Sequence, residues 1–172
     1  MIERRHPNVL NLSEAPSRSQ EKGSKFGFVG KNLGQATGAT GIGCSWYEVL
    51  PGRAAFPSHY HCANEEALYV LEGEGTLCVG KDTVALHAGD YVTFPPGPAH
   101  THKLTNTGAV PLRYLCMSTL KGGAEVVGYP DSNKIAAVGV PAGWRFPEPG
   151  WVRLIVRADT SSLDYYDGED VG

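Results

Sequence analysis

Between residues 42 and 120, short apolar runs alternate with turns rich in glycine, proline, asparagine and aspartate. The runs are about five residues long and recur about every ten residues, which is typical of a β-sandwich or β-barrel. They cover Ile42–Leu50, Ala67–Leu71, Gly75–Val79, Thr83–Leu86, Tyr91–Phe94, His100–Leu104 and Leu112–Met117. No helical period longer than two turns interrupts them. The pattern therefore predicts an all-β fold with its core barrel over about residues 42–120.

The chain of 172 residues fits one domain with additional segments at both ends. We expect an N-terminal arm over residues 1–41, with little structure before residue 24 and a first strand at Phe26–Val29. The glycine-rich stretch 34–43 has no Gly-Lys-Ser/Thr, which favours a flexible loop or bulged strand over a phosphate-binding loop. Residues 121–172 form a C-terminal extension, in which Tyr129–Lys134 is typical of a turn and Val152–Val156 of a last strand.

Charge and composition argue against several functional classes. The formal net charge is −3, and the 15 lysines and arginines are scattered, so we expect neither nucleic-acid nor membrane binding. The N-terminus lacks the apolar core of a signal peptide, and no segment has membrane-spanning length. We therefore expect a cytoplasmic protein in which Cys44, Cys62, Cys78 and Cys116 are reduced and, without a Cys-x-x-Cys pair, hold no structural zinc.

Three histidines and one glutamate stand out as metal-ligand candidates. Side chains at i and i+2 of a strand point to the same side, so His59 and His61 project together. Glu66 follows at the start of the next predicted strand, and His100 follows a proline-rich reversal. If the sheet closes, the four can converge on one interior point and hold one divalent transition metal, such as Zn, Mn, Fe, Ni or Co.

The same residues carry a resemblance to the cupin superfamily. Gly52 to Gly73 resembles the first cupin motif, in which His-x-His is followed by Glu66 and, after six residues, by Gly73. Residues 89–104 resemble the second motif, through Gly89, Pro95, Gly97 and His100. Two positions depart from the pattern. Gly52 lies one residue too far from His59, and Leu104 occupies the place usually given to asparagine, with Asn106 two residues on.

This resemblance implies a double-stranded β-helix (jelly-roll) barrel that holds its metal inside and is usually a homodimer. The whole chain is similar to small bacterial single-domain cupins, for some of which sugar-phosphate isomerase activity has been suggested. His102 shares a face with His100 in a regular strand. It is a candidate base, substrate hydrogen-bond donor or further ligand, or a structural histidine at the barrel mouth.

Three functions remain open from the sequence. The first two are a metal-dependent isomerase of a sugar-phosphate-type metabolite and a dioxygenase of a small enolisable substrate, in which His102 or a tyrosine moves a proton. The third is a non-catalytic sensor that binds a small ligand, without a DNA-binding helix-turn-helix of its own. A phosphorylated substrate needs a cationic anchor, for which the nearby candidates are Arg53, Lys103, Arg113 and Lys121. Candidates to line the cavity are Tyr69, Tyr91 and Tyr114.

Overall fold

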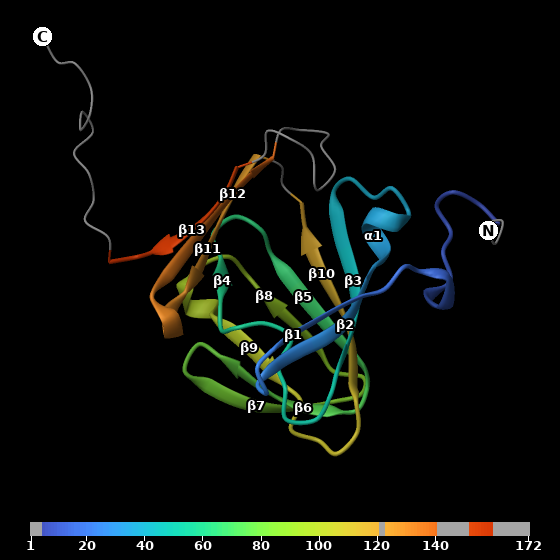
Figure 1. Ribbon diagram of the computed structural model, residues 1–172, viewed down its shortest axis with the longest axis horizontal. Helices are drawn as coiled ribbons and strands as arrows, with labels where there is room; N and C mark the ends of the chain where they lie inside the picture. The colour runs from blue at the N-terminus through green and yellow to red at the C-terminus, as the bar shows by residue number, and fades with distance from the viewer. Residues whose placement is uncertain (1–4, 121–122, 141–151, 160–172) are drawn as a thin grey trace, which may run out of the picture.

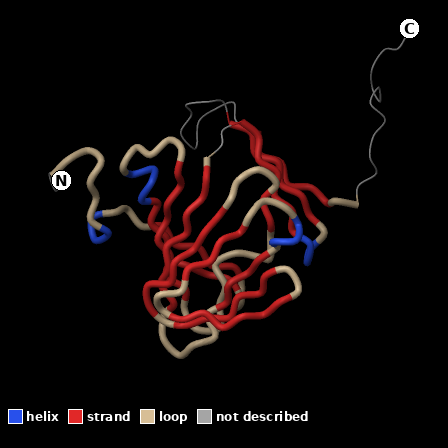
Figure 2. Tube along the Cα trace, turned by 180° about the vertical axis from the view of Figure 1, so that it is seen from behind, coloured by secondary structure: helices blue, strands red, loops and turns tan. Residues whose placement is uncertain are grey.

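The computed structural model describes residues 5–120, 123–140 and 152–159. Strands dominate the described chain, and its helical segments are single short turns (Figure 2). The first strands are β1 (Arg18–Lys22), β2 (Phe26–Asn32), β3 (Ile42–Val49), β4 (Tyr60–His61), β5 (Glu66–Glu72), β6 (Glu74–Val79) and β7 (Asp82–His87). They are followed by β8 (Tyr91–Phe94), β9 (His102–Thr105), β10 (Leu112–Thr119), β11 (Gly123–Tyr129), β12 (Lys134–Val140) and β13 (Val152–Arg157). The helical turns are η1 (Leu12–Glu14), α1 (Leu33–Ala36), η2 (Pro98–His100) and η3 (Pro130–Ser132).

The strands form three antiparallel sheets around a common interior (Figure 1). The largest sheet has the order β1-β2-β3-β10-β5-β8, and β7-β6-β9 forms a second. The third sheet, β13-β12-β11-β4, joins the C-terminal strands to the short strand β4. Non-sequential neighbours such as β3-β10-β5 are what a jelly roll requires, so the predicted all-β barrel is confirmed.

Alternation along the central strands builds the core. In β5, Leu68 and Val70 face inward and are buried, whereas the intervening Tyr69 is exposed. In β10, Leu112 and Tyr114 likewise face inward and are buried. Each fully buried leucine or valine contributes about 1.5–3 kcal/mol relative to an exposed one.

Gly73 shows why the first motif ends in glycine. It lies between β5 and β6 with a φ of +82°, a conformation that side chains with a Cβ rarely adopt. A Cβ there would also lie 2.7 Å from the carbonyl oxygen of Pro111. The tight turn lets β5 pass into β6 with Gly73 alone between the two strands.

Both ends of the chain contribute more to the sheets than the sequence indicated. The expectation of little structure before residue 24 is wrong for β1, which pairs with β2, and β2 pairs in turn with β3. In the glycine-rich stretch, the one-turn helix α1 begins where a loop was expected, because the Asn32 side chain accepts a hydrogen bond from the Gln35 amide. In the extension, β13 was expected, but β11 and β12 were not. No helix in the described residues is long and apolar enough to cross a membrane.

Candidate metal centre

Two short backbone segments place three histidines on one side of the barrel interior. His59 and His102 lie opposite each other and exchange both backbone hydrogen bonds, with N···O distances of 3.1 and 2.8 Å. Such directly opposed residues project their side chains to the same face, and the two ring centroids are 4.6 Å apart. His61 follows His59 by two residues and shares that face, at a centroid distance of 5.4 Å.

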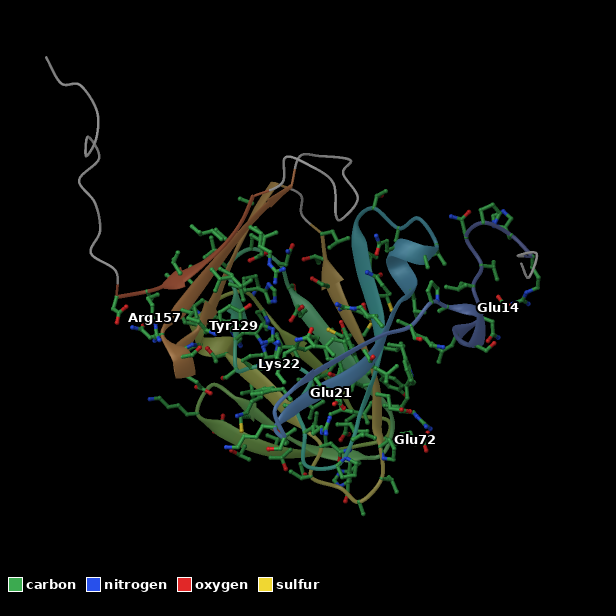
Figure 3. All side chains as sticks on the ribbon, in the orientation of Figure 1. Glu14, Glu21, Lys22, Glu72, Tyr129 and Arg157 are labelled. Atoms are coloured by element: carbon green, nitrogen blue, oxygen red, sulfur yellow. The ribbon has the colours of Figure 1, made fainter. Side chains whose placement is uncertain are left out.

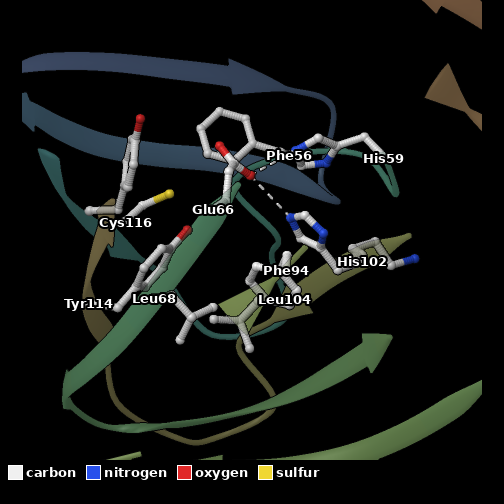
Figure 4. A pocket seen from close by; sticks show the side chains of 11 residues that line it. Phe56, His59, Glu66, Leu68, Phe94, His102, Leu104, Tyr114 and Cys116 are labelled. Atoms are coloured by element: carbon white, nitrogen blue, oxygen red, sulfur yellow. Dashed lines mark ion pairs between the residues drawn. The ribbon is translucent and has the colours of Figure 1, made fainter. Parts of the chain in front are cut away.

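Glu66, the first residue of β5, faces these histidines, of which Figure 4 shows His59 and His102. One oxygen, Oε2, lies 3.3 Å from Nε2 of His102, 3.4 Å from Nε2 of His61 and 3.8 Å from Nε2 of His59. All four side chains are at most 17% exposed. Three imidazole nitrogens therefore converge on a single carboxylate oxygen in a poorly solvated place.

Hydrogen bonds at the other ring nitrogen fix how two of these histidines present Nε2. Nδ1 of His59 lies 2.8 Å from the carbonyl oxygen of Pro57, and Nδ1 of His102 lies 3.0 Å from that of His100. A carbonyl oxygen only accepts, so each Nδ1 must carry the proton. In a neutral ring, Nε2 then offers a lone pair, the state in which imidazole binds a metal.

The charges of the cluster fit a bound cation. Burial alone would raise the pKa of Glu66, but hydrogen bonding to His102, His59 and His61 outweighs it and holds that pKa far below its usual range. An ionised carboxylate facing three imidazole nitrogens is stabilised by positive charge between them, either as protons on mutually repelling imidazolium rings or as one metal ion. The donor set of imidazoles and one carboxylate suits a divalent transition metal. His59, His61 and Glu66 thus form a group that could bind a metal ion.

A second carboxylate, Glu125 of β11, supports the site from behind. Its oxygens accept backbone hydrogen bonds from Cys62, Ala63 and Asn64, at 3.0, 3.1 and 2.8 Å. These three residues connect His61 to the strand that begins with Glu66, so Glu125 fixes the spacing of two site residues. Motif spacing gave no signal for it, since it lies 61 residues from Asn64 in the chain.

Glu125 also faces His61 itself. Its Oε1 lies 3.7 Å from Nδ1 of His61, a buried atom with no hydrogen-bond partner. Burial lowers the pKa of His61, but the Glu66 and Glu125 carboxylates outweigh this and raise it. A small rotation of either side chain would make the Nδ1–H···carboxylate bond that typically orients a metal-binding histidine.

The structure brings His102, and not His100, to Glu66. The helical turn η2 takes up Pro98–His100, so β9 begins only at His102, the residue that pairs with His59. Within the described residues, His100 makes no ion pair with Glu66, and it orients His102 through its backbone oxygen. The sequence assigned His100 as ligand and left His102 as a candidate base, hydrogen-bond donor, further ligand or structural histidine, so the structure differs from that assignment at His100.

The position of Asn106 shows the same two-residue shift as that of His102. Asn106 is fully buried, and its side chain donates to the carbonyl oxygens of Val49 and Val110 and accepts from the Gly108 amide. It lies four residues after His102, as the motif's asparagine should follow its histidine. The histidine and the asparagine of the second motif thus both lie two residues further from Gly97 than the pattern asks. The spacing of His102 and Asn106 could therefore have identified His102 from the sequence.

A cavity of about 180 Å³ adjoins the cluster. Its walls are mostly apolar, with Tyr47, Tyr114 and Cys116 as further polar groups beside His59, Glu66 and His102. The lining also includes Phe56, Leu68, Phe94, Lys103 and Leu104. Phe94 stacks on the His102 ring at 3.7 Å. Of the tyrosines expected here, Tyr114 lines the cavity, whereas Tyr69 and Tyr91 are 39% and 61% exposed.

The four candidate cationic anchors for a substrate phosphate differ in their position relative to the cavity. Lys103 borders the cavity. Arg53 pairs with Glu21 of β1 at 2.7 Å. Arg113 pairs with Glu48 and Glu72, and Figure 3 shows Glu72 on the side of the molecule away from the C-terminal sheet. Lys121 lies outside the described residues.

Comparison with known proteins identifies a domain family and similar structures. The Cupin domain family matches residues 45–118. The structure is similar to that of a proposed sugar phosphate isomerase from Acidithiobacillus ferrooxidans, with a TM-score of 0.71 and 27% identity over 92% of this chain and 97% of the other. It also resembles a sugar phosphate isomerase of the cupin superfamily from Silicibacter pomeroyi, with a TM-score of 0.74 and 23% identity over 91% of this chain and 97% of that one.

A curated sequence gives a shorter match. An uncharacterized protein of Methanocaldococcus jannaschii is 38% identical over 60 residues, which is 35% of this chain and 46% of that protein. The match therefore spans a little under half of that relative. The domain match and the similar folds together show that residues 45–118 form a Cupin domain within the barrel.

Proposed function

We propose that this protein is a metal-dependent enzyme that isomerises a small, oxygen-rich metabolite of the sugar-phosphate type. One observation carries the proposal: three imidazole nitrogens converge within 3.3–3.8 Å of one Glu66 oxygen, beside a cavity of about 180 Å³. Support for the substrate class comes from the proposed sugar phosphate isomerase that is 27% identical along almost its whole length.

The metal would be held by His59, His61, Glu66 and His102. Zinc, manganese, iron, nickel and cobalt all suit this donor set. When bound, such a metal polarises a carbonyl or hydroxyl oxygen of the substrate. His102 is thereby proposed as a ligand, with its Nδ1 fixed by the His100 carbonyl oxygen.

Tyr114 is the proposed proton-holding group of the cavity. Its burial raises the pKa of the phenol well above the usual value, so the hydroxyl is protonated at neutral pH. Figure 4 shows Tyr114 on the cavity wall near Glu66 and Cys116. Isomerisation shifts hydrogen between neighbouring carbons and their oxygens, and a protonated phenol can donate a hydrogen bond to the oxygen where charge develops. Phe56, Leu68 and Leu104 form apolar parts of the cavity wall.

The first test combines metal analysis with turnover. Protein purified without a metal-affinity tag should contain about one equivalent of a transition metal by elemental analysis, and a His61→Ala, Glu66→Ala double variant should contain none. The loaded protein should interconvert a ketose phosphate and its aldose isomer, followed by NMR. Tyr114→Phe should keep its metal and lose about a hundredfold or more in rate.

Each part of this test can contradict the proposal. Protein that stays metal-free after reconstitution with every metal named above would contradict the metal site. Metal-loaded protein that isomerises no pentose or hexose phosphate would contradict the reaction. Oxygen consumption by the iron-loaded protein with a small enolisable substrate would favour a dioxygenase.

A further inference from the structure

The C-terminal sheet presents one face to the metal centre. In the register of β4, β11, β12 and β13, His61 lies opposite Val127, Val127 opposite Ala136, and Ala136 opposite Ile155. Opposed residues share a face, and so do residues at i and i±2. The face that carries His61 therefore also carries Glu125 and Tyr129 of β11, Lys134 of β12, and Arg153 and Arg157 of β13.

Tyr129 links this face to the metal centre. Its ring stacks against that of His59, with a centroid distance of 6.1 Å and an interplanar angle of 26°. Nζ of Lys134 lies 5.4 Å from the centre of the same ring. Burial raises the pKa of Tyr129, the positive charge of Arg153 opposes this rise, and the charge of Glu66 adds to it. The Tyr129 ring thus contacts both Lys134 and His59 of the metal centre, and Figure 3 shows Tyr129 on the barrel side of the C-terminal strands.

Two of the cations on this face, Lys134 and Arg153, lack a carboxylate partner in the described part of the chain. Glu125 shares the face, but its oxygens are taken up by the amides of residues 62–64. Lys134 is half-buried and Arg153 is exposed, so both are open to a ligand. Unpaired cations beside a site attract anionic ligands, and arginine and lysine are the usual partners of phosphate.

We infer that Lys134 and Arg153 form the phosphate anchor of the substrate site, with Tyr129 lying between the anchor and the metal. The inference rests on the proposed function, because it places the phosphate of a sugar phosphate on the C-terminal sheet while the reacting carbons face Glu66 and His102. It also gives the C-terminal extension a direct part in substrate selection. Arg53 and Arg113 are unsuited to this part because glutamates already engage them.

The test measures binding of a pentose 5-phosphate and of the same pentose without phosphate to the metal-loaded protein, by isothermal titration calorimetry. A Lys134→Gln, Arg153→Gln double variant should bind the phosphate ester about tenfold or more weakly, and the unphosphorylated sugar with unchanged affinity. Its metal content and melting temperature should equal those of the parent. Lys81→Gln, in the turn between β6 and β7, removes one positive charge outside the C-terminal sheet and serves as the control for loss of a lysine charge.

The outcomes separate the anchor from the proposed reaction. Phosphate-dependent binding that the double variant retains, or that is lost in Lys103→Gln instead, would overturn the anchor. Absence of any phosphate-dependent binding by the parent would overturn it too. Binding of inorganic phosphate and of the pentose phosphate that the double variant loses, without isomerisation by the parent, would support the anchor and contradict the reaction.

Discussion

His100 and His102 are two residues apart, yet only the side chain of His102 reaches Glu66 in the described structure. The backbone carbonyl oxygen of His100 accepts from Nδ1 of His102, so the two residues act on the same ligand in different ways. Their side chains can therefore be separated by mutation, because an alanine at either position keeps the backbone.

We predict that His102→Ala lowers metal affinity about tenfold or more, which corresponds to a lost contact of at least about 1.4 kcal/mol. His100→Ala should leave the affinity nearly unchanged, since alanine retains the carbonyl oxygen. Competition with a chromophoric chelator for Co²⁺ or Zn²⁺ measures both. An equal or larger loss in His100→Ala would contradict the assignment of His102 as ligand.

Glu125 is predicted to act on the metal through His61 and the loop that follows it. Glu125→Gln keeps the size of the side chain but removes the charge that faces Nδ1 of His61. We expect metal affinity to fall about 10- to 100-fold, the usual effect of removing a group that orients a ligand. The same chelator competition measures it.

The neighbouring Glu65, which is exposed, supplies the control for Glu125. Glu65→Gln makes the same chemical change outside the site and should leave metal affinity unaltered. A Glu125→Gln variant with parental affinity would show that Glu125 acts on the fold alone. In that case Glu125→Gln should lower only the stability of the loop at residues 62–64.

At the scale of elements, β4 joins the barrel to the C-terminal extension. This strand has two residues, and its pairing with β11 sets His61 opposite Val127 and Tyr60 opposite Gly128. The Tyr60 ring lies directly over Gly128, where a Cβ would come within 2.3 Å of ring carbons. Glycine at this position lets the two strands approach and keeps the imidazoles on the opposite face from Tyr60.

We predict that Gly128→Ala destabilises the protein by about 1–3 kcal/mol, because a rigid ring must move to make room. Thermal unfolding followed by circular dichroism measures the change. Gly41→Ala is the matched control, since a Cβ there meets nothing within 4 Å and no left-handed φ is involved. Equal melting temperatures for the two variants would contradict the close packing of Tyr60 on Gly128.

At the scale of the whole molecule, the candidate metal centre brings residues 59–66 together with His102 of β9. A metal that binds the folded state alone stabilises it, by about 2.7 kcal/mol at a free concentration 100 times the dissociation constant. We therefore predict that a chelator lowers the melting temperature of the loaded protein by about 5–10 °C, given about 2–4 °C per kcal/mol for a chain of this size. The His61→Ala, Glu66→Ala variant should not respond, and a response equal to that of the parent would place the metal elsewhere.

The homodimer implied by the family resemblance stays a prediction. Static light scattering on the purified protein, across a range of concentrations, measures the mass against the 18.4 kDa of one chain. A constant mass of one chain at all concentrations would contradict a stable dimer. The cytoplasmic location likewise stays a prediction.

The sequence by itself determined the elements of the barrel and three of the four proposed ligands. Alternation and turn residues are local properties, so the predicted strand Tyr91–Phe94 agrees with β8, and Ile42–Leu50 agrees with β3 to within one residue. His59, His61 and Glu66 could be found because they lie within a few residues of one another on two strands and match a motif of fixed spacing.

Only the tertiary structure decided what the spacing left undetermined. The turn η2 includes Pro98–His100, so His100 lies outside β9. The antiparallel pairing with His59 then places His102 at the metal centre. Glu125 and Tyr129 reach the site from one strand, β11, which the local sequence pattern did not predict. The physical reason is that such contacts depend on how sheets pack and close, and the packing brings together side chains whose separation along the chain carries no periodic signal.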